Sequence, residues 1–199
     1  MIRHFVPLIA FALLAPLSAA PVPKGVKAKA DYYPLALGTK WEYVRYQNAD
    51  NVWAEEVTES TTKDGVTTAT VRITPGGANA VPHDTSYKAD ADGWYFLTQA
   101  DTSYDPPAMF VKTDPKPGDT WEMKYALGGT VYAATATVGQ PEKMTVPAGE
   151  YTALPITIEF DQPGQRRAYT NWYLAGVGMV KQVTGGRVSQ ELKSFTPAK

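Results

Sequence analysis

The sequence carries few of the residue types that perform acid–base or covalent chemistry. His83 lies in Pro82-His83-Asp84-Thr85-Ser86, and His4 is the other histidine. A serine hydrolase needs a serine, a histidine and a carboxylate brought together, and the sequence has no Gly-x-Ser-x-Gly motif for the nucleophile. We therefore expect His83 to lie in an exposed loop, and we predict no catalytic residue.

Metal and cofactor chemistry is also poorly provided for. Cysteine is absent, which excludes disulfides and thiolate metal sites, and two histidines are too few for a histidine-rich zinc site. Asp90-Ala91-Asp92-Gly93 is similar to part of a calcium loop, but Lys88 and Gln99 stand where the first and last ligands belong. We predict no metal site and no cofactor.

Carboxylates leave one enzymatic alternative open. Glu55, Glu56 and Glu59 occur in one expected strand, and nothing in the sequence places an opposed carboxylate at the separation that glycosidases use. We expect these three side chains to solvate an outer face. A carboxylate-dependent hydrolase built on Glu55, Asp84 or Asp105 is the alternative to a binding function.

The aromatic residues are the strongest chemical signal in the chain. Five tryptophans and twelve tyrosines occur among 199 residues. Packing in a core is their ordinary role, and an aromatic-lined ligand surface is the functional alternative. For that alternative, we predict ligand binding by Trp41, Trp94, Trp121, Trp172 and Tyr173.

Strands must position these side chains, because apolar residues recur at every second position. Leu154, Ile156, Ile158 and Phe160 alternate with small or polar residues. Asp64-Gly65 and Asp92-Gly93 are typical of type I′ hairpin turns, and strands joined this tightly must be antiparallel. We predict an all-β fold: a strongly curved antiparallel sheet, forming an open or partly closed barrel of about 10–12 strands, with a β-sandwich as the alternative.

A repeat of about 80 residues relates the two parts of the sequence. Gly38-Thr39-Lys40-Trp41-Glu42 matches Gly118-Asp119-Thr120-Trp121-Glu122, and Gly93-Trp94-Tyr95 corresponds to Asn171-Trp172-Tyr173. We predict that the halves superpose with Trp41 over Trp121 and Trp94 over Trp172, and that Trp172 anchors the core. Chance similarity of common strand residues is the alternative.

The N-terminus has the features of an export signal. Residues 1–20 begin with a short basic segment, continue with an apolar run too short to span a membrane, and end on Ser18-Ala19-Ala20. Residues 21–30 then form a solvated leader, and 31–196 form a single all-β domain with repeat halves of about 31–112 and 113–195. We expect a periplasmic or secreted protein that is not integral to a membrane after cleavage.

Four motifs occur in a fixed order along the predicted domain. They are Y-Y-P-L-A-L-G-T-K-W-E-Y at 32–43, P-G-D-T-W at 117–121, V-P-A-G-E-Y at 146–151 and W-Y-L-A-G-V-G-M-V-K at 172–181. Together they resemble a family of uncharacterised exported bacterial all-β proteins. The resemblance implies a curved sheet, distantly similar to the half-barrels of periplasmic lipoprotein carriers but without a helix to fill the concave face. It implies no catalytic residues.

These observations favour a binding protein over an enzyme. The formal net charge of −1 is unlike that of a nucleic-acid-binding domain. We hypothesise a non-enzymatic exported binding domain whose partner is an apolar small molecule, a lipid or an envelope protein. A purely structural envelope protein and the carboxylate-dependent hydrolase are the alternatives.

Overall fold

The computed structural model describes residues 31–77, 79–161 and 167–199, so the predicted signal (1–20) and leader (21–30) lie outside the described residues. Within the described ranges, no helix has the length and apolar character needed to cross a membrane. The described chain forms thirteen strands: β1 (Lys40–Arg45), β2 (Asn48–Lys63), β3 (Val66–Thr74), β4 (His83–Ala89), β5 (Gly93–Gln99), β6 (Thr102–Lys112), β7 (Thr120–Leu127), β8 (Thr130–Val138), β9 (Glu142–Val146), β10 (Gly149–Phe160), β11 (Arg167–Leu174), β12 (Gly178–Thr184) and β13 (Arg187–Thr196).

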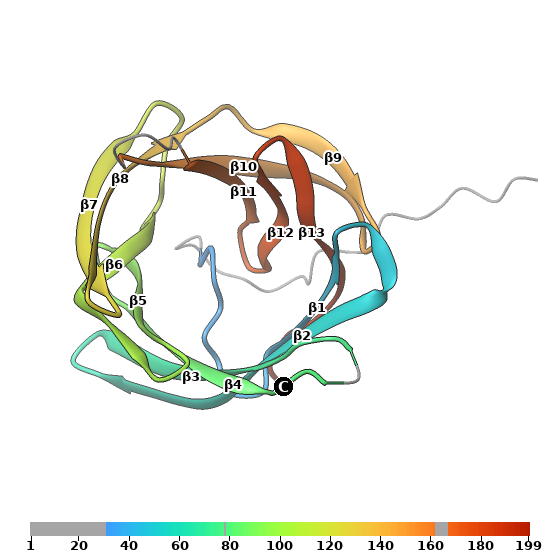
Figure 1. Ribbon diagram of the computed structural model, residues 1–199, viewed down its shortest axis with the longest axis horizontal. Helices are drawn as coiled ribbons and strands as arrows, with labels where there is room; N and C mark the ends of the chain where they lie inside the picture. Colours follow the sequence, from blue (N-terminus) through green and yellow to red (C-terminus); the bar gives the residue numbers. More distant parts are fainter. Residues whose placement is uncertain (1–30, 78, 162–166) are drawn as a thin grey trace, which may run out of the picture.

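Twelve of these strands close into one antiparallel barrel (Figure 1). The strand order runs from β11 through β12, β13 and β1 to β8 and β10, and β10 also pairs with β11, which joins the two ends. The predicted all-β, antiparallel fold is confirmed, and the sheet is a barrel, not a sandwich. Closure removes the exposed edges that an open curved sheet would present to other chains.

The thirteenth strand, β9, lies outside the barrel and was not predicted. It pairs with the first half of β10, while the second half of β10 belongs to the barrel. The resulting β9–β10 hairpin lies against β13, where the Ala148 amide donates to the Leu192 carbonyl at 2.9 Å. The short sequence Glu142–Val146 is mostly exposed and buries one side chain, Val146, so it lacks the alternation that reveals a strand.

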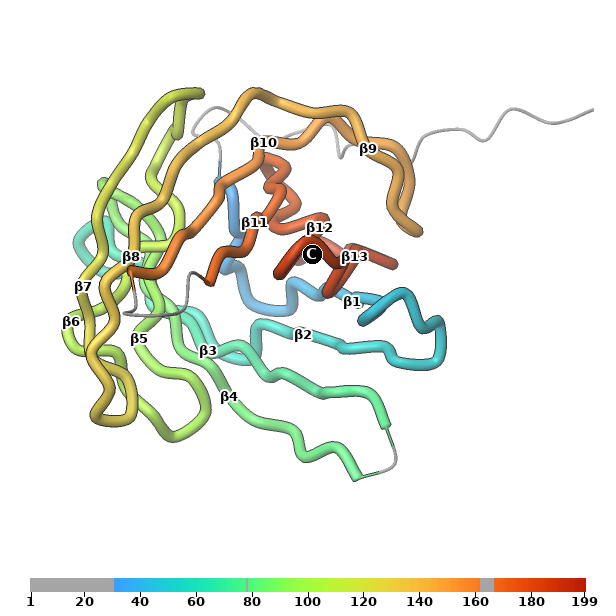
Figure 2. Tube along the Cα trace, turned by 45° about the horizontal axis from the view of Figure 1, so that its top comes forward, coloured from blue at the N-terminus to red at the C-terminus, as the bar shows by residue number. Residues whose placement is uncertain are grey.

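One end of the barrel is filled by residues 31–37, which we call the plug segment. Tyr33 and Leu35 are buried, and the Gly176 amide donates to the Asp31 carbonyl at 2.8 Å. Figures 1 and 2 show this blue segment running inside the ring of strands before β1 begins. An eight-stranded barrel is just wide enough for its own side chains, so a twelve-stranded one has room for an inserted segment. The other end, the mouth, is bordered by the turns that join β1 to β2, β5 to β6 and β12 to β13.

The barrel has one weak seam, between β6 and β7. Only two residue pairs join these strands, at Tyr104–Leu127 and Asp105–Ala126. Pro106 and Pro107 follow directly in β6, and proline has no N–H to donate to a neighbouring strand. Side chains close the rest of the seam: Trp121 Nε1 donates to the Met109 carbonyl at 2.9 Å and Lys112 Nζ to the Thr120 carbonyl at 3.3 Å.

The two predicted Asp-Gly turns differ. Asp64 and Gly65 have φ angles of 51° and 79°, as a type I′ turn requires, so that prediction is confirmed. Asp92-Gly93 joins β4 to β5 as expected, but neither residue has a positive φ in the left-handed region, so the predicted turn type is wrong. Gly93 is needed for a different reason, because a Cβ there would lie 2.5 Å from the Val111 carbonyl oxygen.

The first strands of the two predicted repeat halves share several features. Trp41 and Trp121 are each the second residue of their strands, β1 and β7. The turns before β1 and β7 make the same pair of backbone hydrogen bonds. Gly38 donates to Val57 and Thr39 accepts from it, and Gly118 and Asp119 bond to Val138 in the same way. By contrast, Trp94 is the second residue of β5 and is buried, whereas Trp172 is the sixth residue of β11 and is half-buried. The superposition of Trp94 on Trp172, and with it a repeat beyond the first strands, stays a prediction.

Candidate ligand-binding site

The barrel lumen contains a cavity of about 190 Å³ between the plug segment and the mouth. Tyr33 of the plug segment borders it, as do side chains from β1 to β6 and from β11 to β13. Gln99 lines the cavity and is exposed at the end of β5, so the cavity extends toward the mouth. Nearly every barrel strand therefore positions part of this site.

Glu55 on β2 lies in the cavity wall and is only 9% exposed. Strand alternation places Trp53, Glu55 and Val57 on the inner face of β2, and the Tyr33 hydroxyl donates a 2.8 Å hydrogen bond to Glu55 Oε2. Burial raises the pKa of Glu55, while the Tyr33 hydrogen bond and the positive charge of Arg45 act in the opposite direction. The net shift is upward because loss of hydration dominates.

The hydroxyl groups near Glu55 belong to tyrosines. Burial, reinforced by the negative charge of Glu55, raises the pKa of Tyr33, Tyr43 and Tyr87 well above the ordinary value for tyrosine. Burial also raises the pKa of Tyr173. These phenols therefore keep their protons across the physiological range and act as neutral hydrogen-bonding groups.

Arg45, the last residue of β1, carries the positive charge of the cavity wall near the mouth. Its guanidinium lies 3.9 Å from the ring centroid of Trp53, a cation–π contact. Its Nε donates to the Ser189 carbonyl at 3.2 Å and its Nη2 to the Tyr46 hydroxyl at 3.3 Å. Arg45 is thus held at the mouth by several partners.

Polar side chains line the lumen on β11 to β13, and we call Asn171, Gln182, Ser189 and Gln190 the polar wall. Ser189 Oγ donates to Gln182 Oε1 at 2.9 Å, and Gln182 Nε2 donates to Asn171 Oδ1 at 3.0 Å. Asn171 Nδ2 continues the chain to the Tyr173 hydroxyl at 3.0 Å. Because each group fixes the next, the polar wall is rigid and oriented.

Aromatic rings continue around the inside of the barrel, and four of them line the cavity: Tyr87, Phe96, Phe110 and Tyr169. Each ring contacts the next from β4 to β11, with successive centroids 4.8 to 6.1 Å apart. This spacing is favourable for edge-to-face and offset packing. We call these residues, together with Phe110, the aromatic wall: Tyr87, Phe96, Tyr104, Phe110, Tyr125, Tyr132, Phe160 and Tyr169.

Two buried polar atoms next to the cavity lack a hydrogen-bond partner among the described residues. Thr85 is 1% exposed and its Oγ1 makes no hydrogen bond of normal geometry, although it lies close enough to Tyr87 to oppose the upward shift of that tyrosine's pKa. Trp94 is 6% exposed, and its Nε1 is also unpartnered. Both residues line the cavity. Buried polar groups are usually satisfied, so these atoms indicate an incomplete site.

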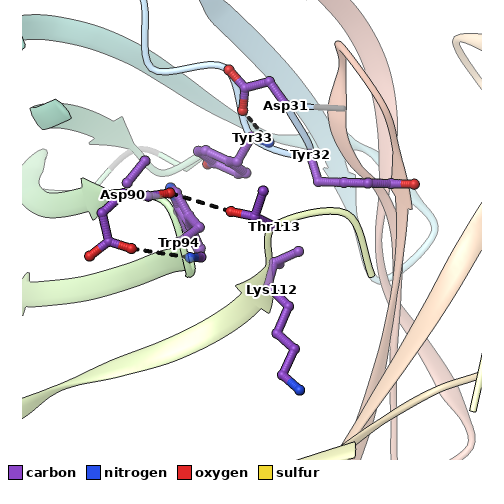
Figure 3. A pocket seen from close by; sticks show the side chains of 10 residues that line it. Asp31, Tyr32, Tyr33, Asp90, Trp94, Lys112 and Thr113 are labelled. Atoms are coloured by element: carbon purple, nitrogen blue, oxygen red, sulfur yellow. Dashed lines mark hydrogen bonds between the residues drawn. The ribbon is translucent and has the colours of Figure 1, made fainter. Parts of the chain in front are cut away.

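A second pocket, of about 320 Å³, lies at the plugged end (Figure 3). Its carboxylates already have partners: Asp90 accepts from the Gly93 amide and pairs with Lys88, and Asp31 accepts from the Tyr33 amide. Figure 3 shows the Thr113 hydroxyl turned toward the Asp90 carbonyl. Because these groups satisfy one another, this pocket is a weaker candidate than the lumen cavity.

The structure separates the five aromatic residues predicted to bind ligand. Trp94 and Tyr173 line the lumen cavity. Trp41 is fully buried at the plugged end, where its Nε1 donates to the Val177 carbonyl, and Trp121 closes the seam. Trp172 faces the outside, because its neighbours Asn171 and Tyr173 both line the cavity.

The prediction that Trp172 anchors the barrel core is wrong. Its indole is half-buried on the outer face of β11, and Nε1 donates to Glu142 Oε2 at 2.9 Å, next to β9. The sequence suggested the opposite orientation because tryptophan is more apolar than asparagine. The lumen reverses this preference, since Asn171 is satisfied there by Gln182 and Tyr173.

The expected outer-face position of Glu55 is also wrong. Of the three glutamates on β2, Glu56 lies outside and pairs with Lys40 at 2.9 Å, and the exposed Glu59 accepts a hydrogen bond from Thr70. Glu55 points inward, and Arg45, Trp53, Thr85 and the polar wall were not predicted as site residues. A signal was present: Arg45 and Glu55 each continue an alternating series that contains tryptophan, as in Trp53-x-Glu55-x-Val57.

The carboxylates proposed for a hydrolase do not meet. Glu55 lies in the lumen, Asp84 is paired with Arg72 on the outside, and Asp105 is exposed on β6. His83 is half-buried as the first residue of β4 and does not lie in a loop. Across the described ranges, no group of three or more His, Cys, Asp and Glu side chains is arranged to hold a metal ion.

Known proteins that are similar to this chain resemble it in fold. Neither the protein-family models nor the curated proteins contain a match to it. A solved structure described as a putative lipoprotein from Parabacteroides distasonis is 13% identical, with a TM-score of 0.56 over 85% of this chain and 100% of that one. A putative exported protein with YmcC-like fold from Bacteroides fragilis is 12% identical, with a TM-score of 0.53 over 83% of this chain and 98% of that one. At these identities the likeness is one of fold alone, and that fold is the one described as YmcC-like.

Proposed function

We propose that this protein is an exported, non-enzymatic binding protein that holds a small, largely apolar molecule in the barrel lumen. The observation that carries the proposal is a cavity of about 190 Å³ bordered by aromatic rings and by the unpartnered Thr85 hydroxyl. Ligand sites are typically apolar hollows with a few convergent polar groups. The aromatic wall supplies the apolar surface, and Thr85, Glu55 and the polar wall supply the polar groups.

The size of the cavity limits the ligand. An engineered apolar cavity of about 150 Å³ binds benzene, so a cavity of 190 Å³ suits a single ring or a short chain. A whole phospholipid does not fit this volume. We therefore favour a ring-sized molecule over the lipid or envelope protein that the sequence left open.

Export is part of the proposal. The N-terminal residues 1–20 have the composition of a secretory signal, and the two structures of similar fold are described as an exported protein and a lipoprotein. Both observations support a location outside the cytoplasm. A periplasmic or secreted binding protein would meet its ligand there.

The test is to titrate the protein with benzyl alcohol, a neutral ring-sized probe, and to monitor binding by tryptophan fluorescence. Trp53 and Trp94 line the cavity and would report occupancy. We expect Ile73→Phe, which fills the cavity from β3, to weaken binding at least about tenfold, at a folding cost of about 1–3 kcal/mol. Val131→Phe is the matched control, since Val131 is 62% exposed on β8.

Native mass spectrometry of protein purified gently after export gives an independent readout. A co-purifying small molecule that is lost in Ile73→Phe but kept in Val131→Phe supports the proposal. Ligand-free protein whose fluorescence does not respond to a panel of small aromatic and aliphatic molecules would overturn it. That result would favour a structural envelope protein.

A further inference from the structure

Glu55 differs from the other carboxylates of the described chain because it is buried and forms no ion pair among the described residues. Its neighbour Glu56, one residue along β2, is exposed and paired with Lys40. A buried carboxylate without a cationic partner is costly, so its position in the lumen calls for an explanation.

The hydrogen bond from Tyr33 accounts for only one side of Glu55. It occupies Oε2, and Oε1 has no hydrogen-bond partner among the described residues. A glutamine could accept the same bond through its amide oxygen. Pinning the plug segment therefore requires a hydrogen-bond acceptor at position 55 but not a negative charge.

Arg45 does not neutralise Glu55 within the cavity. Its guanidinium is stacked on Trp53 and donates to Ser189 and Tyr46 near the mouth. It makes no salt bridge with Glu55 and acts on the carboxylate only at longer range, as the weakest influence on its pKa. The inner part of the cavity therefore holds a carboxyl group that no cationic side chain pairs with among the described residues.

Aromatic side chains surround the carboxyl group of Glu55. Tyr33, Tyr87, Trp94 and Tyr173 line the cavity together with Glu55. The π faces of such rings are electrically negative and attract cations, most strongly where water is excluded. A carboxylate among aromatic rings is therefore suited to a positively charged group that also presents apolar surface.

We propose that the lumen cavity binds a small organic cation, whose amine or ammonium group pairs with Glu55 while its ring-sized apolar body contacts the aromatic wall. This inference rests on the proposed function and names its ligand class. The Thr85 hydroxyl, which lacks a partner, provides a further acceptor for an N–H group of the ligand. A cation would give the buried carboxylate the partner that the protein does not supply.

Binding of this kind depends on pH in a defined direction. The pairing requires ionised Glu55, and burial raises the pKa of that carboxyl in the free protein. Affinity should therefore fall as the pH is lowered through this pKa. The titratable or charged groups that act on Glu55 from the surrounding elements are Tyr33 of the plug segment, Tyr43 and Arg45 of β1, Tyr87 of β4 and Tyr173 of β11.

Three probes of nearly equal size test the proposal on the full chain: benzylamine, benzyl alcohol and benzoate. By calorimetry at neutral pH, we expect benzylamine to bind at least about tenfold more tightly than benzyl alcohol, and benzoate to bind weakest. Glu55→Gln keeps the acceptor for Tyr33 and should bring benzylamine and benzyl alcohol to similar affinities. Glu56→Gln, on the outer face, should leave the preference intact.

Each outcome decides between the two proposals. If benzyl alcohol binds and benzylamine binds no more tightly, the cation is wrong and the binding function stands. If benzoate binds tightest, recognition belongs to Arg45 and the inference is overturned. If none of the three binds, both proposals fail. Should Glu55→Gln not fold, the wild-type protein still tests the idea, because the preference for benzylamine must decrease on acidification.

Discussion

The two sides of the lumen are built by different physical means. Rings in contact form the aromatic wall from β4 to β11, and a chain of directed hydrogen bonds forms the polar wall on β11 to β13. The aromatic wall contributes buried area and accepts any apolar shape that fits, whereas the polar wall fixes orientation. One side of the lumen therefore supplies most of the apolar contact, and the other supplies the directed hydrogen bonds.

The largest effect is expected from the aromatic wall. Phe110 is buried and contacts the rings of Phe96 and Tyr104 at 4.3 and 6.4 Å, so Phe110→Ala should lower the free energy of unfolding by about 3–5 kcal/mol. Trp172→Ala, on the half-buried outer face, should cost only about 1–2 kcal/mol. Chemical denaturation measures both. Equal losses would mean that the lumen rings do not form the main core.

Breaking the polar wall should cost less. Asn171→Ala leaves Gln182 and Tyr173 each without one hydrogen bond, and we expect a loss of about 1–3 kcal/mol in the free energy of unfolding. Replacing both amides, as in Asn171→Leu with Gln182→Leu, removes donor and acceptor together. The double variant should be the more stable of the two in urea unfolding. A double variant less stable than Asn171→Ala would show that the hydrogen bonds themselves stabilise the fold.

Thr85→Val should stabilise the protein while weakening binding. The substitution keeps the shape of the side chain and removes a buried hydroxyl that has no partner, which should gain on the order of 1 kcal/mol. Thr68→Val, at an exposed position on β3, is the control. Thermal unfolding and titration with benzylamine would be measured on both. Lower stability in Thr85→Val would mean that the hydroxyl is satisfied within the wild-type protein.

The smallest effect concerns the pH dependence of stability. Burial raises the pKa of Glu55 above that of the unfolded chain, so the folded state binds more protons in the interval between the two values. The contribution of Glu55 to the free energy of unfolding is fully present below its pKa in the unfolded chain. It is lost as the pH rises through its pKa in the folded protein. The stability of Glu55→Gln relative to wild type should therefore increase with pH. Parallel profiles in urea titrations at several pH values would contradict this.

Much of the fold could be predicted because alternation and turn chemistry are local. Leu154, Ile156 and Ile158 were expected on one buried face, and all three are buried on β10. The antiparallel arrangement followed from the short connections. Closure could not be predicted, because it depends on the pairing of β1 with β13, the first and last strands of the described chain.

The site was harder to predict because a lumen reverses the usual rule that buried faces are apolar. Asn171 and Glu55 face inward while Trp172 faces outward, so hydrophobicity alone assigned the wrong face to β11 and to Glu55. Trp94 and Tyr173, two of the predicted residues, do line the cavity. Their assignment to ligand binding remains a prediction.

The seam between β6 and β7 is the place where we expect the barrel to open first. Twelve continuous ladders would make every strand equally hard to remove, but here two residue pairs hold one joint. Local openings follow the least protected contacts, so the cylinder should unroll at this joint first. Amides of β7 that face β6 would then exchange with solvent sooner than those that face β8. The aromatic wall crosses this joint between Tyr104 and Tyr125, so these two rings would separate there. We therefore expect the lumen to become accessible to solvent along the β6–β7 seam as well as at the mouth.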